Sequence, residues 1–278
     1  MAIITNTEKQ QVLQQLIVEF GEEKIAPLVK SHHKWLQKHP EGTIAAWSKA
    51  MSLDALSFLD EQEPFWTFVA ARIYLAEVYS QQAERRGTTA DAVYTKFAEN
   101  VRILSKKGIY NPSIMESYSN EELEQLGNLL VAKRDSLFTY IALKTLLDRY
   151  VAKDFNKDIV ELPQERWLVI AMTLMKDEKE NRLEKIKEAY WAMSNLYMTV
   201  ATPTLSNAGK PHGQLSSCFI DTVDDSLQGI YDSNTDVATL SKFGGGIGVY
   251  MGKVRSRGSS IRGFVGASSG VLPWIKQL

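Results

Sequence analysis

The sequence is poor in the residue types that build disulfides and metal sites. It contains one cysteine, Cys218, and four scattered histidines, His32, His33, His39 and His212. A single cysteine cannot form a disulfide within the chain, which is typical of proteins from a reducing compartment. The spacing of these five residues matches no common set of metal ligands. We therefore expect no internal disulfide, no bound metal ion and a cytoplasmic location.

Long apolar runs and an excess of charge of one sign are also missing. No apolar stretch approaches the length needed to cross a bilayer, and the N-terminal residues MAIITNTEKQ do not resemble a signal peptide. The 278 residues carry 32 basic and 33 acidic side chains, a formal net charge of −1. This balance gives no reason to expect nucleic acid or a membrane as a partner. The composition, 44% hydrophobic, fits one large or two small globular domains.

The N-terminal part of the chain is polar and weakly periodic. An amphipathic segment over Val12–Val29 is interrupted by Gly21 and Pro27, two residue types that disfavour helix interiors. The adjacent His32 and His33 match no recognised metal motif, and we interpret them as a solvated pair.

Helical periodicity dominates from Ile44 to about Val200. The expected helices cover residues 44–59, 62–83, 120–131, 136–151, 163–175 and 182–198. Ser119 and Glu122 form a predicted capping box at the start of the third of these helices. Four aromatic residues are expected in the core rather than at a cofactor: Trp66, Tyr140, Trp167 and Trp191.

The densest run of unusual residues spans 201–263 and includes the cysteine. Period-two alternation over Leu215–Ile220 predicts a strand that carries it. Asp224–Ser226 is typical of a helix N-cap, and the helix that follows must stop at Gly244–Gly246, because glycine accepts left-handed dihedral angles. Ile247–Met251 predicts a second strand. The expected unit is therefore strand, helix, strand.

Glycines followed by arginines can bind a phosphate group. Glycine lets a ligand approach the backbone, and Arg255, Arg257 and Arg262 follow on a Gly/Ser-rich loop that could clamp an anion. However, Gly244–Val249 lacks the third glycine of a dinucleotide fingerprint, and no P-loop is present. On spacing alone, a phosphate site and a plain turn both remain open.

Five segments resemble the large (alpha) subunit of ribonucleotide reductase, in family order and spacing: TPTLSNAG, QLSSCF, DDSL, LSKFGGGIG and VRSRGSSIRG. In the helical half, PFWTFVAARIYL, GIYNPSIMESYSNEEL and RDSLFTYIALKTLLDRYV are similar to class I members. The resemblance implies an α/β fold, with a mainly helical domain followed by the first strands and helix of a ten-stranded α/β barrel. The implied boundaries are 1–45 for an N-terminal extension without a complete ATP-binding regulatory module, 46–200 for the helical domain and 201–278 for the incomplete barrel.

The resemblance also implies a chemistry. In this family the large subunit reduces ribonucleoside diphosphates to deoxyribonucleoside diphosphates through a thiyl radical and a pair of reducing thiols. By motif match, Cys218 is the first thiol of that pair, whereas the alternative for a free cysteine is a buried small hydrophobe. Thr202, Ser217 and Gly246 match substrate-binding positions.

Three further residues, Asp225, Arg255 and Arg262, match positions that bind an allosteric effector, a dNTP or ATP. For Asp225 the alternative is a plain N-cap. The implied partners are a second alpha subunit, a small (beta) subunit whose metal site generates the radical, and thioredoxin or glutaredoxin. No cofactor is expected on this chain apart from the nucleotide effectors.

The chain ends inside the expected barrel, without the second thiol and the other family cysteines. We therefore expect it to be inactive without the missing C-terminal part of the alpha subunit. A split gene, an intron or intein boundary and a truncated gene all remain open, and the alternative function is a catalytically dead remnant that binds nucleotides or a partner. Unpaired strand edges predict that 215–251 is poorly stable alone.

Overall fold

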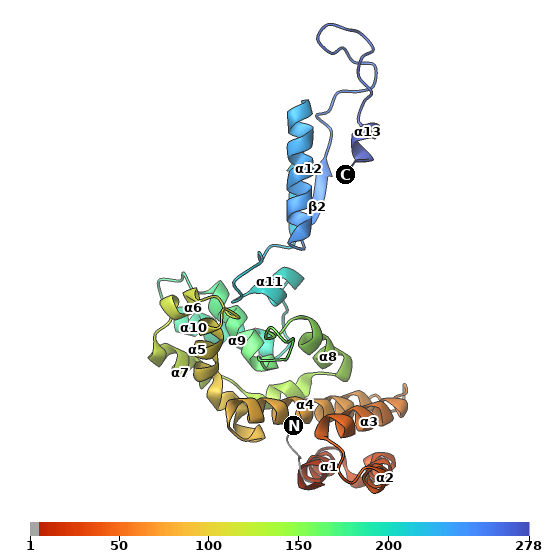
Figure 1. Ribbon diagram of the computed structural model, residues 1–278, viewed down its shortest axis with the longest axis vertical. Helices are drawn as coiled ribbons and strands as arrows, with labels where there is room; N and C mark the ends of the chain where they lie inside the picture. The colour runs from red at the N-terminus through yellow and green to blue at the C-terminus, as the bar shows by residue number, and fades with distance from the viewer. Residues whose placement is uncertain (1–5, 278) are drawn as a thin grey trace. The chain divides into compact units, whose positions relative to one another are not determined.

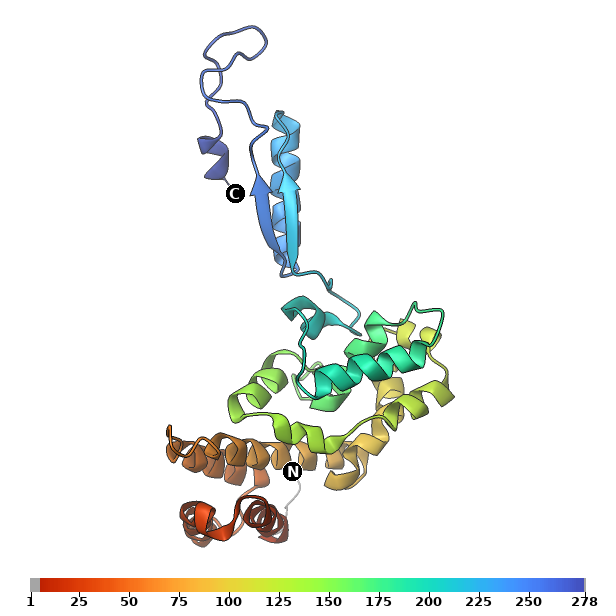
Figure 2. The ribbon, with the colours of Figure 1, turned by 180° about the vertical axis from the view of Figure 1, so that it is seen from behind.

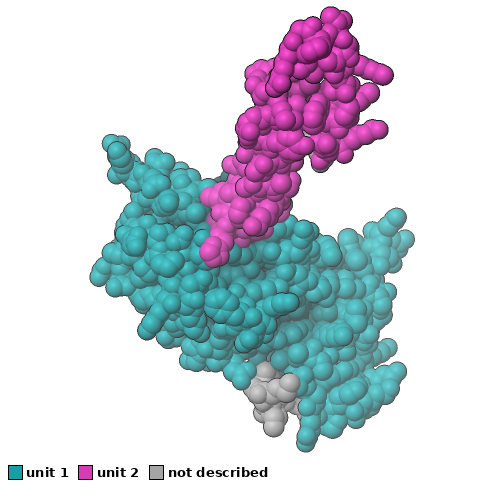
Figure 3. Space-filling view, turned by 45° about the horizontal axis from the view of Figure 1, so that its top comes forward, with its two compact units in different colours: residues 1–199, 209–211 teal, residues 200–208, 212–278 magenta. Residues whose placement is uncertain are grey.

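The computed structural model describes residues 6–277, so the first five residues of the N-terminal segment discussed above and Leu278 lie outside it. The chain divides into two compact units, coloured separately in Figure 3. Unit 1 comprises residues 1–199 and 209–211, and unit 2 comprises residues 200–208 and 212–278. The assignment of these units as reductase domains stays a prediction. Within the described residues, no helix combines the length and apolar character needed to cross a membrane.

Unit 1 is helical (Figures 1 and 2). Its α-helices are α1 (Asn6–Phe20), α2 (Glu22–Lys38), α3 (Ile44–Ser57), α4 (Trp66–Arg86), α5 (Phe97–Lys106), α6 (Ser113–Ser117), α7 (Asn120–Gly127), α8 (Tyr140–Arg149), α9 (Pro163–Leu174) and α10 (Arg182–Ser194). Two 3-10 helices, η1 (Ala90–Lys96) and η2 (Ala132–Leu137), connect them. The predicted capping box is confirmed, because the Ser119 hydroxyl accepts from the Glu122 amide and the Glu122 carboxylate accepts from the Ser119 amide.

Two predicted helices begin later than expected. The helix expected over 62–83 is α4, which begins at Trp66 and continues to Arg86. The segment expected to be helical from residue 136 is divided into η2 and α8, because Thr139 has extended dihedral angles and its hydroxyl caps α8 by accepting from the Ala142 amide. An N-cap residue of this kind fixes the start of a helix, and residues before it leave the helical path.

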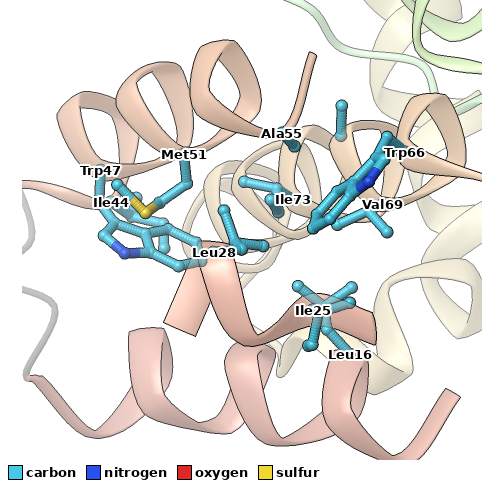
Figure 4. Packing of buried hydrophobic residues seen from close by; sticks show 11 residues of the cluster. Leu16, Ile25, Leu28, Ile44, Trp47, Met51, Ala55, Trp66, Val69 and Ile73 are labelled. Atoms are coloured by element: carbon cyan, nitrogen blue, oxygen red, sulfur yellow. The ribbon is translucent and has the colours of Figure 1, made fainter. Parts of the chain in front are cut away.

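The first four helices share a hydrophobic core (Figure 4). Its labelled members are Leu16 from α1, Ile25 and Leu28 from α2, Ile44, Trp47, Met51 and Ala55 from α3, and Trp66, Val69 and Ile73 from α4. Burying a large apolar side chain contributes about 1.5–3 kcal/mol, so this cluster accounts for much of the stability of the N-terminal helices.

The prediction that both Gly21 and Pro27 interrupt the N-terminal helix is half wrong. Gly21 separates α1 from α2 with φ +92°. Pro27, by contrast, lies inside α2. Its ring removes one helical hydrogen bond, but Ile25 and Leu28 on either side are fully buried in the shared core, and this packing offsets the loss.

The prediction that His32 is solvated is also wrong. Its ring is fully buried and lies edge-on to the Trp47 ring, with 5.9 Å between the ring centroids. Trp47 Nε1 donates to His32 Nδ1 at 3.1 Å, which leaves Nε2 to donate to Gln10 Oε1 at 3.2 Å. Burial lowers the pKa of His32 to about 4, with smaller contributions from the charges of His33 and Lys9. The ring is therefore neutral at pH 7.

The core prediction for the aromatic residues holds for Trp66 and Trp167, and Tyr140 is partly buried against the N-terminal core. Trp191 differs, because its side chain is 51% exposed. The buried face of α10 passes through its neighbour Tyr190, and adjacent helical residues point about 100° apart.

A buried polar cluster joins four segments of unit 1. The carboxylate of Asp135 in η2 accepts hydrogen bonds from the Tyr79 and Tyr94 hydroxyls and, at 2.6 Å, from Gln164 Nε2. These donors come from α4, η1 and α9. Burial raises the pKa of Asp135 to about 6. The three donors satisfy the carboxylate and fix the packing of the surrounding helices.

Unit 2 contains α11 (Thr202–Asn207), β1 (Cys218–Thr222), α12 (Leu227–Lys242), β2 (Gly246–Tyr250) and α13 (Leu272–Ile275). The two strands are parallel neighbours, and α12 forms the connection between them. The α/β fold class and the strand–helix–strand order are thus confirmed. The N-cap of α12 is Ser226, whose hydroxyl accepts from the Gly229 amide at 3.0 Å.

The two strand predictions need correction at their ends. The first strand starts at Cys218 rather than Leu215, because the carbonyl groups of Gln214 and Leu215 accept hydrogen bonds from side chains of α11 instead of from a neighbouring strand. The second starts one residue earlier than expected, at Gly246, whose amide already belongs to the strand pairing.

We predict that His32 makes unit 1 sensitive to acid. The pKa of His32 is about 4 in the folded chain and near 6.5 when unfolded, so the unfolded state binds the proton first as the pH falls. The contribution of His32 to the free energy of unfolding should therefore drop by about 2–3 kcal/mol between pH 6.5 and pH 4. The raised pKa of Asp135 acts in the opposite direction over the same range, so the effect of His32 is the difference between the parent chain and a variant without this imidazole. In His32→Gln this part of the pH dependence should vanish. The free energy of unfolding is measured at each pH by urea unfolding followed by tryptophan fluorescence.

His39→Gln is the matched control, because His39 is exposed on the same N-terminal segment. This variant should keep the full pH dependence of the parent chain. If the free energy of unfolding of the parent and of His32→Gln depended equally on pH, the assignment of this effect to His32 would be contradicted.

Candidate functional site

Three of the sequence-predicted residues meet where β1 and β2 begin. The strand register pairs Cys218 with Gly246. The Gly246 amide donates to the Ser217 carbonyl at 2.9 Å, and Ser217 Oγ lies 3.4 Å from Cys218 Sγ, where either atom can donate. The hydroxyl, the thiol and a side-chain-free backbone segment thus lie side by side.

The thiol faces outward. Cys218 is a free, exposed cysteine, and along β1 the residues Cys218, Ile220 and Thr222 are exposed while Phe219 and Asp221 are half-buried. The alternative interpretation of Cys218 as a buried small hydrophobe is therefore wrong for this structure. An exposed thiol is available for reaction in a way that a buried structural cysteine is not.

The three glycines of the turn before β2, Gly244–Gly246, differ in why a side chain is absent. Gly244 has φ +80°, a left-handed conformation that favours glycine. A Cβ on Gly245 would come within 2.7 Å of the Phe219 ring. At Gly246 a Cβ would meet only the Ser217 carbonyl oxygen, at 3.5 Å. The absence of a side chain at Gly246 is thus not required by packing, and it leaves the backbone beside the thiol open.

Thr202 lies on a different segment from the other predicted substrate residues. It is exposed at the start of α11, and none of the described hydrogen bonds joins it to the thiol segment. The same helix nevertheless holds that segment, because Thr204 Oγ1 donates to the Leu215 carbonyl at 2.7 Å and Asn207 Nδ2 donates to the Gln214 carbonyl at 2.9 Å. Sequence reasoning missed both residues, although they lie within the TPTLSNAG segment.

Two of the three predicted effector residues form an ion pair. Asp225 Oδ1 accepts from the Arg255 amide at 3.0 Å, and Oδ2 accepts from Arg255 Nε at 2.8 Å. The hydrogen bond from the Arg255 backbone and then those from its side chain lower the pKa of Asp225. Because Ser226 caps α12, the interpretation of Asp225 as a plain N-cap is wrong. Arg255 Nη1 also donates to the Ser260 carbonyl at 2.9 Å.

Arg262 is not part of that pair. It is exposed in the loop that follows β2 and has φ +52°, an uncommon value for a residue with a side chain. Across residues 6–277, no group of three or more His, Cys, Asp and Glu side chains is arranged to hold a metal ion. The site thus consists of the Cys218 thiol, nearby hydroxyl groups and the open backbone at Gly246. The Asp225–Arg255 ion pair is separate from it.

Comparison with known proteins identifies the family of the chain. Residues 136–213 match the family model described as ribonucleotide reductase, all-alpha domain, and residues 216–278 match the one described as ribonucleotide reductase, barrel domain. The two matches together cover just over half of the chain. The chain belongs to the ribonucleotide reductase large-subunit family. The resemblance noted from the sequence segments is thereby confirmed.

The chain is similar over most of its length to several reductase subunits. It is 43% identical over 223 residues to ribonucleoside-diphosphate reductase subunit alpha of Treponema pallidum (strain Nichols), a match that covers 80% of this chain and 26% of that protein. The subunit alpha of Helicobacter pylori (strain J99) is 40% identical over 223 residues, covering 80% and 27%. The large chain 2 of Saccharomyces cerevisiae is 32% identical over 232 residues, covering 81% and 25%. The chain thus spans about a quarter of the length of these curated relatives.

We predict that the Asp225–Arg255 pair protects the loop after β2 from proteolysis. Trypsin must withdraw the Arg255 side chain from the carboxylate before it can cut there, so Asp225→Ala should speed cleavage after Arg255 about tenfold, the effect of losing roughly one charge-assisted hydrogen bond. The cleavage rate is measured by mass spectrometry of the released peptides. Asp224→Ala is the control, because Asp224 is an exposed neighbour for which the described residues provide no hydrogen bond. Equal rates for both variants and the parent would contradict the prediction.

Proposed function

We propose that this chain is a portion of the large subunit of a class I ribonucleoside-diphosphate reductase. In this proposal it supplies the start of the catalytic barrel, and it acts together with the remaining part of an alpha subunit. The observation that carries the proposal is the exposed thiol of Cys218, held in register with Gly246 and next to the Ser217 hydroxyl. The family membership supports it, and the class I assignment depends on the resemblance of the helical half.

The proposed role of Cys218 is that of an electron-donating thiol. Two thiols together lose two electrons and two hydrogens, form a disulfide, and replace the 2′-hydroxyl of the ribose by hydrogen while water leaves. Cys218 is the chain's only cysteine, so the second sulfur has to come from another polypeptide segment. We assign the radical that starts this reaction to a metal-containing small subunit, and the re-reduction of the disulfide to thioredoxin or glutaredoxin.

The proposed substrate contacts follow from what each group can donate. The Thr202 and Ser217 hydroxyls can donate to the diphosphate and ribose oxygens, and the open backbone at Gly246 allows the sugar to approach the thiol. Backbone approach of this kind needs a residue without a side chain, which is the part Gly246 plays in the proposal.

We assign the Asp225–Arg255 pair to the nucleotide effector that the family resemblance implies. Aspartate can accept from a sugar hydroxyl and arginine can bind a phosphate, and in this structure each satisfies the other instead. An effector would therefore exchange one set of charge-assisted hydrogen bonds for another. Arg262, exposed on the same loop, is a second cation for the phosphates. In the proposal the effector acts within an alpha homodimer in the cytoplasm.

The catalytic part of the proposal predicts strict dependence on Cys218. The chain is co-expressed with a polypeptide that carries the remainder of an alpha subunit and with the small subunit, and deoxyribonucleoside diphosphate formation is assayed. The complex should be active, and Cys218→Ser should lower turnover by about a thousandfold or more, because a serine cannot close the disulfide.

Ser216→Ala is the matched control, since it removes an exposed hydroxyl from the same segment, and it should leave turnover close to that of the parent. An active complex whose rate is unchanged by Cys218→Ser would refute the proposed role of this thiol. A complex without activity would favour the alternative of a non-catalytic remnant, provided the effector experiment below succeeds.

Effector binding can be tested on the chain itself. A fluorescent deoxynucleoside triphosphate should bind the parent chain, and the double variant Asp225→Ala with Arg255→Ala should weaken binding by about a hundredfold, the expected loss of two charge-assisted interactions. Asp224→Ala, in which the ion pair is intact, should bind like the parent. Binding that survives the double variant would show that the effector assignment is wrong.

A further inference from the structure

The segment that leads into Cys218 has no regular secondary structure, yet it is held at consecutive residues. Thr204 Oγ1 donates to the Leu215 carbonyl at 2.7 Å, and Asn207 Nδ2 donates to the preceding carbonyl, that of Gln214, at 2.9 Å. Thr204 and Asn207 are three residues apart on α11, so their side chains leave the same face of the helix. Two adjacent carbonyl groups are thus fixed by one short helix.

The same segment is shaped to receive these side chains. Gly213 has φ +104°, and a Cβ built there would lie 2.6 Å from the Asn207 side-chain carbon. Only glycine therefore fits under the Asn207 amide. On the other side, Gln214 Nε2 donates to the Phe243 carbonyl at the end of α12 at 3.3 Å. The segment is therefore attached to α11 and to α12 before it enters β1.

We propose that Thr204 and Asn207 are positioning residues for the thiol of Cys218. By fixing the carbonyls of Gln214 and Leu215, they deliver Ser217 to the Gly246 amide and set the register of β1. The inference deepens the proposed function, on which its catalytic meaning rests, whereas the geometric part does not depend on that function.

Helix α11 connects the proposed substrate contact with the thiol segment. The helix begins at Thr202, the proposed diphosphate contact, and its side chains hold the segment that carries the reducing thiol. Because α11 has only six residues, the proposed phosphate contact and the two residues that hold the thiol segment lie within two helical turns of one another. Small displacements of a reacting group cost large factors in rate, and such a link keeps the thiol within reach of the sugar.

The geometric part is tested by hydrogen exchange of the Gly246 amide in the full chain. This amide donates to Ser217, just beyond the held segment. Thr204→Val keeps the shape of the side chain but removes the hydroxyl, and it should speed exchange about five- to tenfold, as expected for the loss of one hydrogen bond. Thr204→Ser keeps the hydroxyl and should exchange like the parent.

Ser206→Ala is the matched control on the same helix, because no hydrogen bond of its hydroxyl occurs among the described residues. It should not change the exchange rate. Equal exchange in Thr204→Val and the parent would overturn the inference, and so would a Gly246 amide that is unprotected in the parent chain.

The catalytic part is tested in the complemented reductase. Thr204→Val should lower kcat about tenfold and leave the KM for the nucleoside diphosphate within about twofold, since it displaces the thiol and not the phosphate contact. Thr204→Ser should restore kcat. A change in KM alone would overturn the positioning role. If the complemented complex is inactive, the proposed function fails, and the exchange experiment still decides whether Thr204 holds the segment.

Discussion

The hydrogen bond from the Gly246 amide to the Ser217 carbonyl is the constraint on which the site depends. It begins the parallel pairing that places Cys218 opposite Gly246. Side chains alternate along a strand, so a slip of one residue would turn the thiol inward and bring the Phe219 ring to the exposed face. The register of β1 thus decides which of its side chains are exposed. The register in turn is set by the segment that precedes β1.

The Asp225–Arg255 ion pair lies beyond the ends of β1 and β2, opposite the ends that hold the thiol. Asp225 follows β1 and precedes α12, and its partner Arg255 follows β2. The glycine turn that places Gly246 beside the thiol follows the opposite end of α12. Any ligand that displaces Arg255 from Asp225 therefore acts on the connections of the same two strands that hold the site.

Local signals in the sequence predicted much of this arrangement, because helices, caps and glycine turns depend on neighbouring residues. The strand–helix–strand order and the glycine stop were readable in this way. The errors come from tertiary contacts. His32 is buried because Trp47, from the next helix, supplies its hydrogen-bond donor, and Pro27 is tolerated because its neighbours pack in a shared core. Neither partner can be inferred from spacing along one helix.

The same distinction applies to the site. Cys218, Ser217 and Gly246 could be named from their motifs, and their mutual geometry could not. The start of β1 was misplaced because alternation alone does not reveal that side chains of α11 take the carbonyls of the preceding residues. Likewise, the alternative of a plain N-cap for Asp225 stayed open in the sequence, because spacing alone shows neither that Ser226 caps α12 nor that Asp225 pairs with Arg255, thirty residues later.

The exposed face of the two strands links stability to chemistry. Cys218 shares this face with Ile220, 88% exposed, and Tyr250, 57% exposed. Burying such side chains is worth about 1.5–3 kcal/mol each, so whatever covers the face is held there largely by apolar contacts. Under the proposed function, a segment that covers this face would also surround the thiol of Cys218. Completing the hydrophobic layer and bringing a second sulfur to Cys218 would then be coupled.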